Sequence, residues 1–478
     1  MSSRNVPPRP SESSYPATSQ RGEMHRQARE IFDRSLGQSA IPAAFSRQLR
    51  LEDGRILISG SGRDFVYNLE QYSAIYIVAL GKAALPMTET FLKTLEAQPQ
   101  QRRIRGICSA PTLPERPHSG IEYFAGGHPF PNHDSLHSAR AALDLLSTAN
   151  RETLVVFLIS GGGSSLFEAP LEKEISLEET VAFHRALVGC GAAIAEINTV
   201  RKHFSAVKGG RLAAAAADAP QLSLLISDVP EGRLDALASG PTVPDSSTLE
   251  ECGAILERYR LFDQLPPRVR AFFIHPDLPE TPKHLPGLAL SRVLLSNQDL
   301  VEAARRHAEA LGWKTEIDNS CDDWDYREAA RYLLRRLREL RGEHTRVCLL
   351  SGGEITVRLE GIPGSGGRNQ QFALACALDL AENPMGASCS PRIVPGPARP
   401  EGIAILSAGS DGVDGMSPAA GAIADATTVT RAHALGLDAL AALRSFNAYP
   451  LFHSLGDAVV SGPTGNNLRD LRILLSWK

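Results

Sequence analysis

The sequence predicts an α/β protein of two domains, each with a mainly parallel sheet flanked by helices. Six short apolar runs each end abruptly in a loop of Gly, Ser, Asp or Asn, and helical patterns fill the gaps between them. The 478 residues suffice for two or three domains. Open α/β sheets bind ligands just beyond the carboxyl ends of their strands. We therefore expect a Rossmann-like N-terminal domain and an active site in the cleft between the domains.

The six expected strands are apolar on both faces and rich in β-branched residues, as buried strands of parallel sheets are. They are residues 74–80, 154–159, 222–226, 293–295, 347–350 and 403–406. Amphipathic helices are expected at 23–36, 134–149, 176–195, 299–312, 324–341 and 372–382.

Proline-rich segments divide the chain. Residues 265–288 are the predicted boundary between an N-terminal domain over 23–270 and a C-terminal domain over 286–478. Residues 383–401 are interpreted as a solvent-exposed insertion. Residues 1–22, rich in Pro and Ser, are expected to form a disordered extension.

Composition narrows the class of partner. The net charge is -4 and there is no basic block, which argues against nucleic acid or a membrane surface as partner. No apolar stretch approaches the roughly 18 residues of a membrane span. The seven cysteines are scattered without a CxxC pair, which favours a reducing compartment and no structural zinc. We expect a cytoplasmic protein with small-molecule partners; organelle targeting by residues 1–20 and a homodimer both stay open.

The loop after residues 154–159 is the first candidate site. Ser160, Gly161, Gly162, Gly163, Ser164 and Ser165 offer unhindered backbone N–H groups and hydroxyls, which suit an anion. A tight turn that needs glycine is the alternative. Lys82 follows Gly81 as at the end of a P-loop, but Tyr76 and Ala83 depart from that motif, and no GxGxxG occurs.

Three further features of the N-terminal half suggest binding. Residues 198–211 bring Asn198 together with Arg201, Lys202, Lys208 and Arg211, which either neutralise a polyphosphate or carboxylate or form a solvated helix face. Asp228 follows residues 222–226 and suits a base or a metal ligand, with helix capping as the alternative. Gly240 lies in another Gly/Ser/Thr loop.

The C-terminal half has its own polar loops. Gly353 and Glu354 follow residues 347–350, and Gly367, Arg368 and Asn369 form a glycine turn before a helix. Arg368 suits bidentate binding of phosphate or carboxylate, unless the turn is a surface hairpin. Asp411 and Asp414 suit a divalent cation or ribose, or mark an Asp-Gly turn. Asn297 and Thr464 lie in further polar turns.

Eight segments, in this order, resemble the ATP-dependent glycerate 2-kinases, whose C-terminal half contains a MOFRL domain, here about 345–472. They are ISGGGSSL, INTVRKHFSAVKGGRLA, SDV, ASGPTVPD, SGGE, GGRNQ, AGSDGVDG and GPTG. The resemblance implies transfer of the γ-phosphoryl group of ATP to the 2-hydroxyl of D-glycerate, with Mg²⁺ required. It implies Lys82, Asp228 and Arg368 as catalytic residues and Asp228 and Glu354 as metal ligands. The other residues named in the loops above are implied to bind substrate or nucleotide: Ser160 to Ser165, Asn198, Arg201, Lys208, Gly240, Asn297, Gly353, Gly367, Asn369, Asp411 and Thr464.

The chain departs from the family pattern in several loops, which could alter substrate range or activity. Glu231-Gly232 replaces Gly-Asp, Asn132 replaces Asp, Asn447-Ala448 replaces Asp-Ser and Asn466 replaces Thr. Two other functions therefore stay open. One is an NAD(P)H-dependent hydroxypyruvate reductase, a label some family members carry, although the dinucleotide fingerprint is missing. The other is a catalytically idle binding protein.

Overall fold

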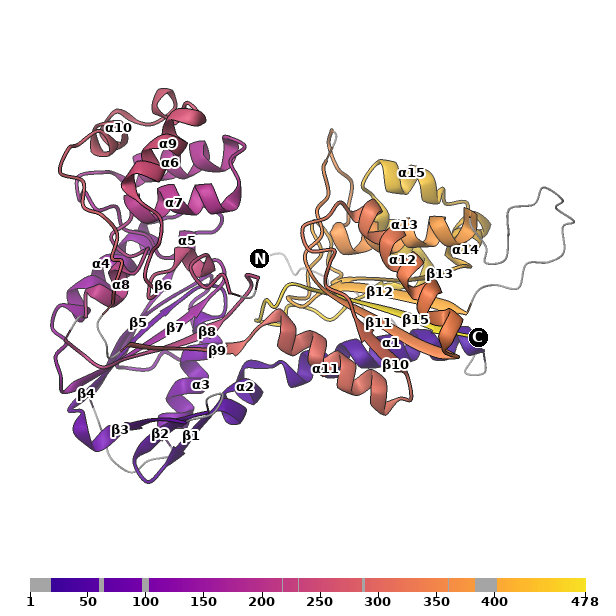
Figure 1. Ribbon diagram of the computed structural model, residues 1–478, viewed down its shortest axis with the longest axis horizontal. Helices are drawn as coiled ribbons and strands as arrows, with labels where there is room; N and C mark the ends of the chain where they lie inside the picture. Colours follow the sequence, from indigo (N-terminus) through magenta and orange to yellow (C-terminus); the bar gives the residue numbers. More distant parts are fainter. Residues whose placement is uncertain are drawn as a thin grey trace, which may run out of the picture. The chain divides into compact units, whose positions relative to one another are not determined.

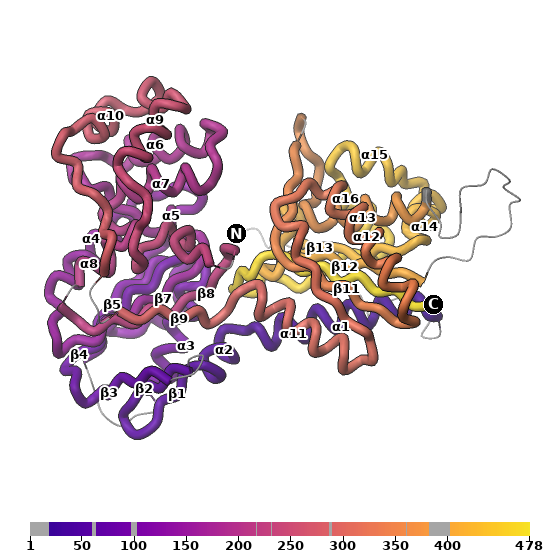
Figure 2. The backbone as a smooth tube through the Cα atoms, in the orientation of Figure 1, coloured from indigo at the N-terminus to yellow at the C-terminus, as the bar shows by residue number. Residues whose placement is uncertain are grey.

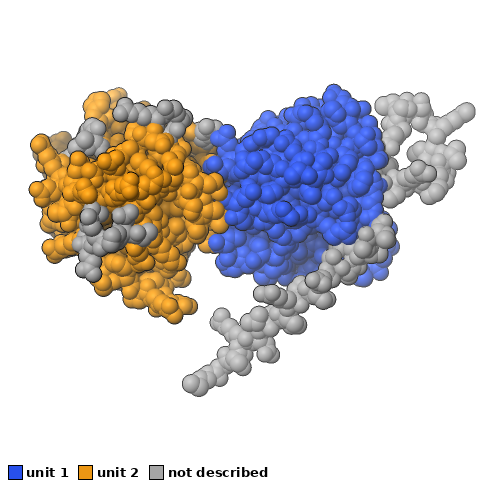
Figure 3. All heavy atoms as spheres, turned by 90° about the horizontal axis from the view of Figure 1, so that it is seen from below, with its two compact units in different colours: residues 1–39, 297–464, 468–478 blue, residues 40–296, 465–467 orange. Residues whose placement is uncertain are grey.

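The computed structural model describes residues 19–59, 64–96, 103–216, 218–230, 232–285, 289–359, 361–382 and 402–478 (Figure 1). The chain forms two compact units, coloured separately in Figure 3. Unit 1 consists of Met1–Ser39, Asn297–Thr464 and Leu468–Lys478, and unit 2 of Ala40–Ser296 and Gly465–Asn467. The predictions for residues 1–18 and 383–401 lie outside the described residues.

Unit 2 contains the predicted parallel sheet. Its strand order is β6-β5-β4-β7-β8-β9, and every neighbouring pair is parallel. The strands are β4 (Ala74–Leu80), β5 (Arg103–Ala110), β6 (Ile121–Ala125), β7 (Thr153–Ser160), β8 (Gln221–Ile226) and β9 (Ala289–Leu295). The chain builds outward from β4 in one direction and from β7 in the other. The topological switch point of this doubly wound sheet therefore lies between β4 and β7.

Helices cover both faces of this sheet (Figure 1). The α3 helix packs against β4, β5 and β7, while α4 packs on the other face over a core that includes Val78, Phe157 and Ala142. A small sheet of β1 (Leu49–Glu52), β2 (Arg55–Ile58) and β3 (Phe65–Asn68) completes the unit. Its helices are α2 (Ile41–Gln48), α3 (Ala84–Glu96), α4 (His133–Leu146), α5 (Gly163–Leu166), α6 (Leu177–Gly189), α7 (Ile194–Phe204), α8 (Arg211–Ala214), α9 (Leu249–Arg258) and α10 (Pro267–Phe273), with short 3-10 turns at Leu69–Gln71, Leu237–Ser239 and Leu261–Asp263.

Unit 1 contains a mixed sheet, which corrects the prediction of a mainly parallel one. Its strand order is β10-β11-β15-β12-β13-β14, and only the β10 and β11 pair is parallel among its described strands. The strands are β10 (Lys314–Ile317), β11 (Arg346–Gly353), β12 (Ile403–Gly409), β13 (Gly421–Asp425), β14 (Ala458–Val459) and β15 (Asp470–Trp477).

Two of the four antiparallel pairs among the described strands of this sheet involve β15. The last strand of the chain lies between β11 and β12 and runs antiparallel to both. Consequently β11 and β12 point in the same direction, as predicted, although they are not neighbours. The loops that follow β11 and β12 and the residue that begins β15 therefore lie at one edge of the sheet.

The helices of unit 1 lie on both faces of its sheet (Figure 1, Figure 2). The α12 to α16 helices cover one face, with Leu333, Leu337 and Phe372 in the core between them and the sheet. The α1 and α11 helices cover the other. The bounds are α1 (Gln20–Gln38), α11 (Asn297–Ala310), α12 (Tyr326–Glu343), α13 (Arg368–Glu382), α14 (Thr428–Ala434), α15 (Ala439–Arg444) and α16 (Ala448–Leu455).

The compact units differ from the predicted domains at three places, one of which is that Gly465–Asn467 belongs to unit 2. The α1 helix, predicted in the N-terminal domain, packs on unit 1, because its apolar face contacts α11, β12 and β15. His25 and Arg21 of α1 also hold the buried Asp425 carboxylate, at 2.7 and 2.6 Å. In addition, β9 is the sixth strand of unit 2, so unit 2 continues to Ser296, beyond the predicted boundary at 265–288.

Candidate active site

The first group of predicted residues lies at the switch point of the parallel sheet in unit 2. Lys82 follows β4 and Gly161 follows β7, which pairs with β4. The Lys82 backbone N–H donates to the Gly161 carbonyl at 2.8 Å, and the Ala83 N–H donates to Ser160 Oγ at 2.9 Å. The Lys82 side chain is exposed. We call Lys82, residues 160–165 and Asp228 the glycine-loop site.

The glycines of this loop are required by space. A Cβ on Gly161 would overlap the carboxylate of Asp228, which follows β8. A Cβ on Gly162, whose φ is +80°, would lie 2.9 Å from Cγ of Lys82. The Asp228 carboxylate thus packs against Gly161, and the aliphatic part of the Lys82 side chain packs against Gly162. This juxtaposition supports the anion-loop interpretation over that of a turn alone.

Replacing Gly161 with Ala should therefore damage the site while leaving the unit folded. The added methyl group must displace Asp228, and a misplacement of about 1 Å can lower the rate on the order of 100-fold. The measurement is kcat together with the far-ultraviolet circular dichroism spectrum. Gly253→Ala is the matched control, because a Cβ on that glycine of α9 meets nothing within 4 Å. Equal activity of the two variants would show that Asp228 needs no fixed position.

Polar side chains extend the glycine-loop site in two directions. Ser164 Oγ lies 2.9 Å from Ser239 Oγ, and the latter donates to Oδ1 of Asn198 at 3.1 Å. On the other side Ser165 Oγ lies 3.0 Å from Nδ1 of His128. Burial, together with the charge of Lys82, lowers the pKa of His128. His128 was not among the residues predicted from the sequence, and only the fold shows that it lies beside Ser165.

The basic residues of 198–211 separate into different roles. Lys208 is buried and its Nζ lies 2.6 Å from Glu168 Oε2, which also contacts His184 at 3.0 Å. Burial alone would raise the pKa of Glu168, but the charges of Lys208 and His184 hold it at about 2. Lys208 was predicted to bind a ligand, but in the structure it is part of a buried ion pair.

Two more cations of this segment are engaged elsewhere. Lys202 pairs with Asp235 and Asp245, and Arg211 donates to the Pro279 carbonyl. Gly240, at φ +63°, accepts the Gly210 N–H at 2.7 Å and shapes a turn. Only Arg201 lies beside the polar side chains that reach the glycine loop, with its Nη1 3.5 Å from Asn198 Oδ1.

The second group of predicted residues lies in unit 1 and centres on Arg368. Its Nε donates to Asp470 Oδ2 at 2.6 Å, and its Nη2 donates to Glu354 Oε1 at 2.7 Å and Asp470 Oδ1 at 3.1 Å. Asp470 is buried. Burial alone would lower the pKa of Arg368, but the charge of Asp470 outweighs it and raises the pKa above its usual range. We call Arg368, Glu354 and Asp470 the arginine site; Asp470 was not predicted.

Three residues predicted to bind ligand support this site from inside the protein. The Asp414 carboxylate caps α13 by accepting the N–H groups of Asn369 and Gln370, at 3.0 and 2.9 Å. Burial raises the pKa of Asp414 to about 6. Asn369 Oδ1 accepts from Ser407 Oγ, and a Cβ on Gly367 would overlap Asp414. These contacts position Arg368 at the first residue of α13.

Asn297 likewise supports the loop after β11. Its Oδ1 accepts the Gly353 N–H at 2.9 Å, and its Nδ2 donates to the Leu468 carbonyl at 2.7 Å. Gly353 itself has φ +89°, which favours glycine. The amide of Asn297 thus serves the protein itself and does not face a ligand.

A hollow of about 580 Å³ opens beside the arginine site. Arg368, Glu354, Asp411 and Asp414 line it together with Asp323, Ile355, Thr356, Val357, Val413 and Gly415. Thr464 holds its edge, since its N–H donates to the Asp411 carbonyl and its hydroxyl to that of Ser410. Both aspartates of the predicted pair line this hollow, although Asp414 is committed to α13.

Two of the loop departures, Asn132 and Asn447, have structural roles. Asn132 caps α4 through Oδ1, and its Nδ2 donates to the Ala125 carbonyl at 2.9 Å, which an Asp could not do. Asn447 Oδ1 accepts the Ser365 N–H at 2.9 Å beside the glycine turn. Glu231 lies outside the described residues.

The carboxylates fit magnesium to different degrees. Among the described residues, no three His, Cys, Asp or Glu side chains are grouped to hold a metal ion. Mg²⁺ bound with a nucleotide needs only one or two carboxylates, because phosphates and water supply the other ligands. Asp228, half-buried at the end of a strand, fits this requirement. Glu354 fits it less well, since its carboxylate pairs with Arg368.

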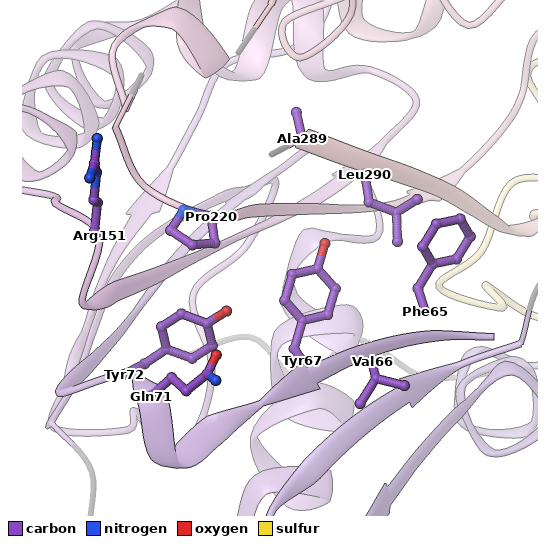
Figure 4. A pocket seen from close by; sticks show the side chains of 9 residues that line it. All are labelled: Phe65, Val66, Tyr67, Gln71, Tyr72, Arg151, Pro220, Ala289 and Leu290. Atoms are coloured by element: carbon purple, nitrogen blue, oxygen red, sulfur yellow. The ribbon is translucent and has the colours of Figure 1, made fainter. Parts of the chain in front are cut away.

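Another hollow, of about 490 Å³, lies in unit 2 at the amino ends of the strands of the parallel sheet, opposite the glycine-loop site (Figure 4). Pro220 precedes β8 and Ala289 begins β9, so this hollow faces the amino ends of the strands. The Tyr67 hydroxyl points into it and donates to the Gln221 carbonyl at 3.0 Å. No predicted site residue lines this hollow.

Both halves of the chain match known protein families. A family model described as "Domain of unknown function (DUF4147)" matches residues 27–274, and the MOFRL family model matches residues 347–470. A relative from Thermotoga maritima named D-glycerate 2-kinase is 36% identical over 406 residues, which cover 84% of this chain and 90% of the relative. A crystal structure of a glycerate kinase from the same organism matches with a TM-score of 0.78 at 33% identity, covering 95% of this chain and 100% of that chain.

One relative has a different name. A protein of Agrobacterium vitis named as a hydroxypyruvate reductase is 36% identical over 364 residues, 75% of this chain and 78% of the relative.

Within the described part of the chain, no helix has the length and apolar character needed to cross a membrane.

Proposed function

The chain belongs to the family of glycerate kinases that combine a DUF4147 domain with a MOFRL domain, and we propose that it is an ATP-dependent glycerate 2-kinase. The reaction transfers the γ-phosphoryl group of ATP to the 2-hydroxyl of D-glycerate and yields 2-phosphoglycerate and ADP. The two substrates are the small-molecule partners of the protein. The described cysteines are free thiols, which supports a cytoplasmic location.

The observation that carries this proposal is the glycine-loop site. Lys82 and Asp228 contact consecutive glycines of one turn at the switch point of the sheet, where α/β proteins bind their ligands. Phosphoryl transfer depends mainly on positioning and on neutralising negative charge, for which a lysine, backbone N–H groups and a carboxylate suffice. Lys82 neutralises the transferred phosphoryl group, and the N–H groups of the glycine loop hold phosphate oxygens.

Asp228 has one of two roles beside the glycine loop. Its carboxylate either accepts the proton of the 2-hydroxyl or holds Mg²⁺, which when bound supplies positive charge to the phosphates. The arginine site adds a further cation. The bonds to Asp470 and Glu354 use Nε and Nη2 of Arg368, which leaves Nη1 to donate to a substrate anion.

The test of the proposed function is ADP formation in the presence of ATP, Mg²⁺ and D-glycerate. ADP should form only when all three are present. The competing assignment, a hydroxypyruvate reductase, has support from the name of one relative. Oxidation of NADH or NADPH by hydroxypyruvate, without glycerate-dependent ADP formation, would favour the reductase.

Asp228→Asn should separate the two roles of this carboxylate. The substitution keeps the shape of the side chain and removes its charge. If Asp228 is the base, kcat falls at every magnesium concentration; if it is a metal ligand, activity partly recovers as magnesium rises. The measurement is kcat across a magnesium titration. Full activity at ordinary magnesium would exclude both roles.

A further inference from the structure

Arg201 is a largely buried cation that has no matching anion in the described part of the chain. Its Nε is buried without a hydrogen-bond partner, and its Nη1 reaches only Asn198 Oδ1, at 3.5 Å. No carboxylate of the described residues forms an ion pair with it, whereas Lys202 of the same segment pairs with two carboxylates and Lys208 with one. Burial lowers the pKa of Arg201. Keeping a guanidinium in this state costs free energy unless an anion binds to it.

The nearby carboxylate is already engaged. Glu168 is fully buried, and its Oε2 contacts both Lys208 Nζ and His184 Nε2. Its charge still acts on Arg201 and raises the pKa of the guanidinium, though less than burial lowers it. Arg201, Lys208 and His184 thus lie near a single buried carboxylate, that of Glu168. One further negative charge would balance the charge of Arg201.

The surroundings of Arg201 connect it to the glycine-loop site. Asn198, one turn earlier on α7, accepts from Ser239 Oγ at 3.1 Å, and Ser239 lies 2.9 Å from Ser164 of the glycine loop. Ser239 has φ +60°, a left-handed conformation that is uncommon for serine. Its carbonyl accepts the Gly209 N–H at 3.0 Å, which holds the turn in place.

We propose that Arg201 and Asn198 bind the carboxylate of the acceptor, a 2-hydroxycarboxylate. This assignment rests on the proposed function. A planar carboxylate matches the fork of a guanidinium and supplies the missing charge. Arg368, the other guanidinium near a proposed site, already binds two carboxylates, so Arg201 is the better receptor for a third. Lys82 and the loop N–H groups remain for the phosphates.

The test compares Arg201→Met and Arg201→Lys with the control Arg258→Gln. Arg258 of α9 pairs, on an exposed surface, with Glu196, which lies on α7 as Arg201 does. For Arg201→Met the KM for D-glycerate should rise by roughly 10- to 100-fold, as expected when hydrogen bonds to a charged group are lost. The KM for ATP should change by less than about 2-fold, because the phosphates bind elsewhere. Arg201→Lys should recover only part of the loss, and Arg258→Gln should resemble wild type.

Thermal unfolding without substrate separates binding from a structural role. Because Arg201→Met removes an unpaired buried charge, its Tm should equal or exceed that of wild type. A purely structural arginine gives the opposite pair of results, a lower Tm with an unchanged KM for D-glycerate. A rise in the KM for ATP alone would also overturn the assignment, since Arg201 would then serve the nucleotide.

Calorimetric titration with D-glycerate alone distinguishes this inference from the proposed function. If wild type binds D-glycerate, Arg201→Met does not, and no ADP forms, the carboxylate site stands and the kinase assignment fails. If Arg201→Met binds D-glycerate as wild type does, the inference fails whatever the turnover. The titration is repeated with ADP and Mg²⁺ present, and if wild type does not bind D-glycerate under either condition, both are wrong.

Discussion

Replacing Lys82 with Met lowers kcat by about 100-fold or more and leaves the fold intact. The thioether keeps much of the stem that packs beside Gly162 but removes the charge that we assign to the phosphoryl group in transit. Removing one preorganised group that stabilises charge in a transition state commonly lowers kcat by about 100- to 1000-fold. Because the Lys82 side chain is exposed, the unfolding free energy should change little.

Lys93→Met is the matched control for this experiment. Lys93 is an exposed lysine of α3, the helix that follows Lys82, and it lies outside the glycine-loop site. Steady-state kinetics with both substrates varied should separate the two variants. A Lys82→Met enzyme with kcat near that of wild type would reduce this lysine to a structural role.

Arg368→Lys is expected to be nearly as harmful as Arg368→Ala. The guanidinium donates to Asp470 through Nε and Nη2 and to Glu354 through Nη2, and it has Nη1 left for a substrate, whereas a lysine has one nitrogen for all three. Since we assign the glycerate carboxylate to Arg201, the defect should appear chiefly in kcat. A rise in the KM for D-glycerate alone would assign the carboxylate to Arg368.

The same substitution should also reduce stability, because Asp470 is buried and loses part of its partner. Leaving a buried charged group incompletely bonded costs roughly 2 kcal/mol, which urea unfolding can measure. Arg338→Lys is the control, since Arg338 pairs with Asp379 of α13 in the same unit but outside the arginine site. If Arg368→Lys matches this control in kcat, in both KM values and in stability, Arg368 is an ordinary surface cation.

The local features of the fold could be predicted from the sequence. β4, β7 and β8 are apolar on both faces and are followed by Gly81, Gly161 and Ser227-Asp228, so the strands and the end of the sheet that carries the site both follow from the sequence pattern. The glycine turn before α13 could likewise be predicted, because Gly364, Gly366 and Gly367 mark it in the sequence. Chain order does not determine strand order, however, and nothing local in residues 470–477 places β15 between β11 and β12.

The roles of individual polar residues were harder to predict, because they depend on distant partners. Lys208 and Arg201 are seven positions apart in one motif, yet Glu168 neutralises the first and leaves the second unpaired. Asn297 and Asn369 lie in the predicted loops but bond inside the protein. Asp470 is the first residue of β15 and belongs to no motif, and only the fold brings it to Arg368.

The position of the phosphate on the product tests the central claim most directly. After incubation with ATP, Mg²⁺ and D-glycerate, the product should be a substrate for enolase without added phosphoglycerate mutase, and its phosphorus NMR signal should couple to the single proton on C2. The account predicts one product, 2-phosphoglycerate, formed in equal amount to ADP. A product that requires the mutase, and is therefore 3-phosphoglycerate, would contradict it, as would the absence of any phosphorylated glycerate.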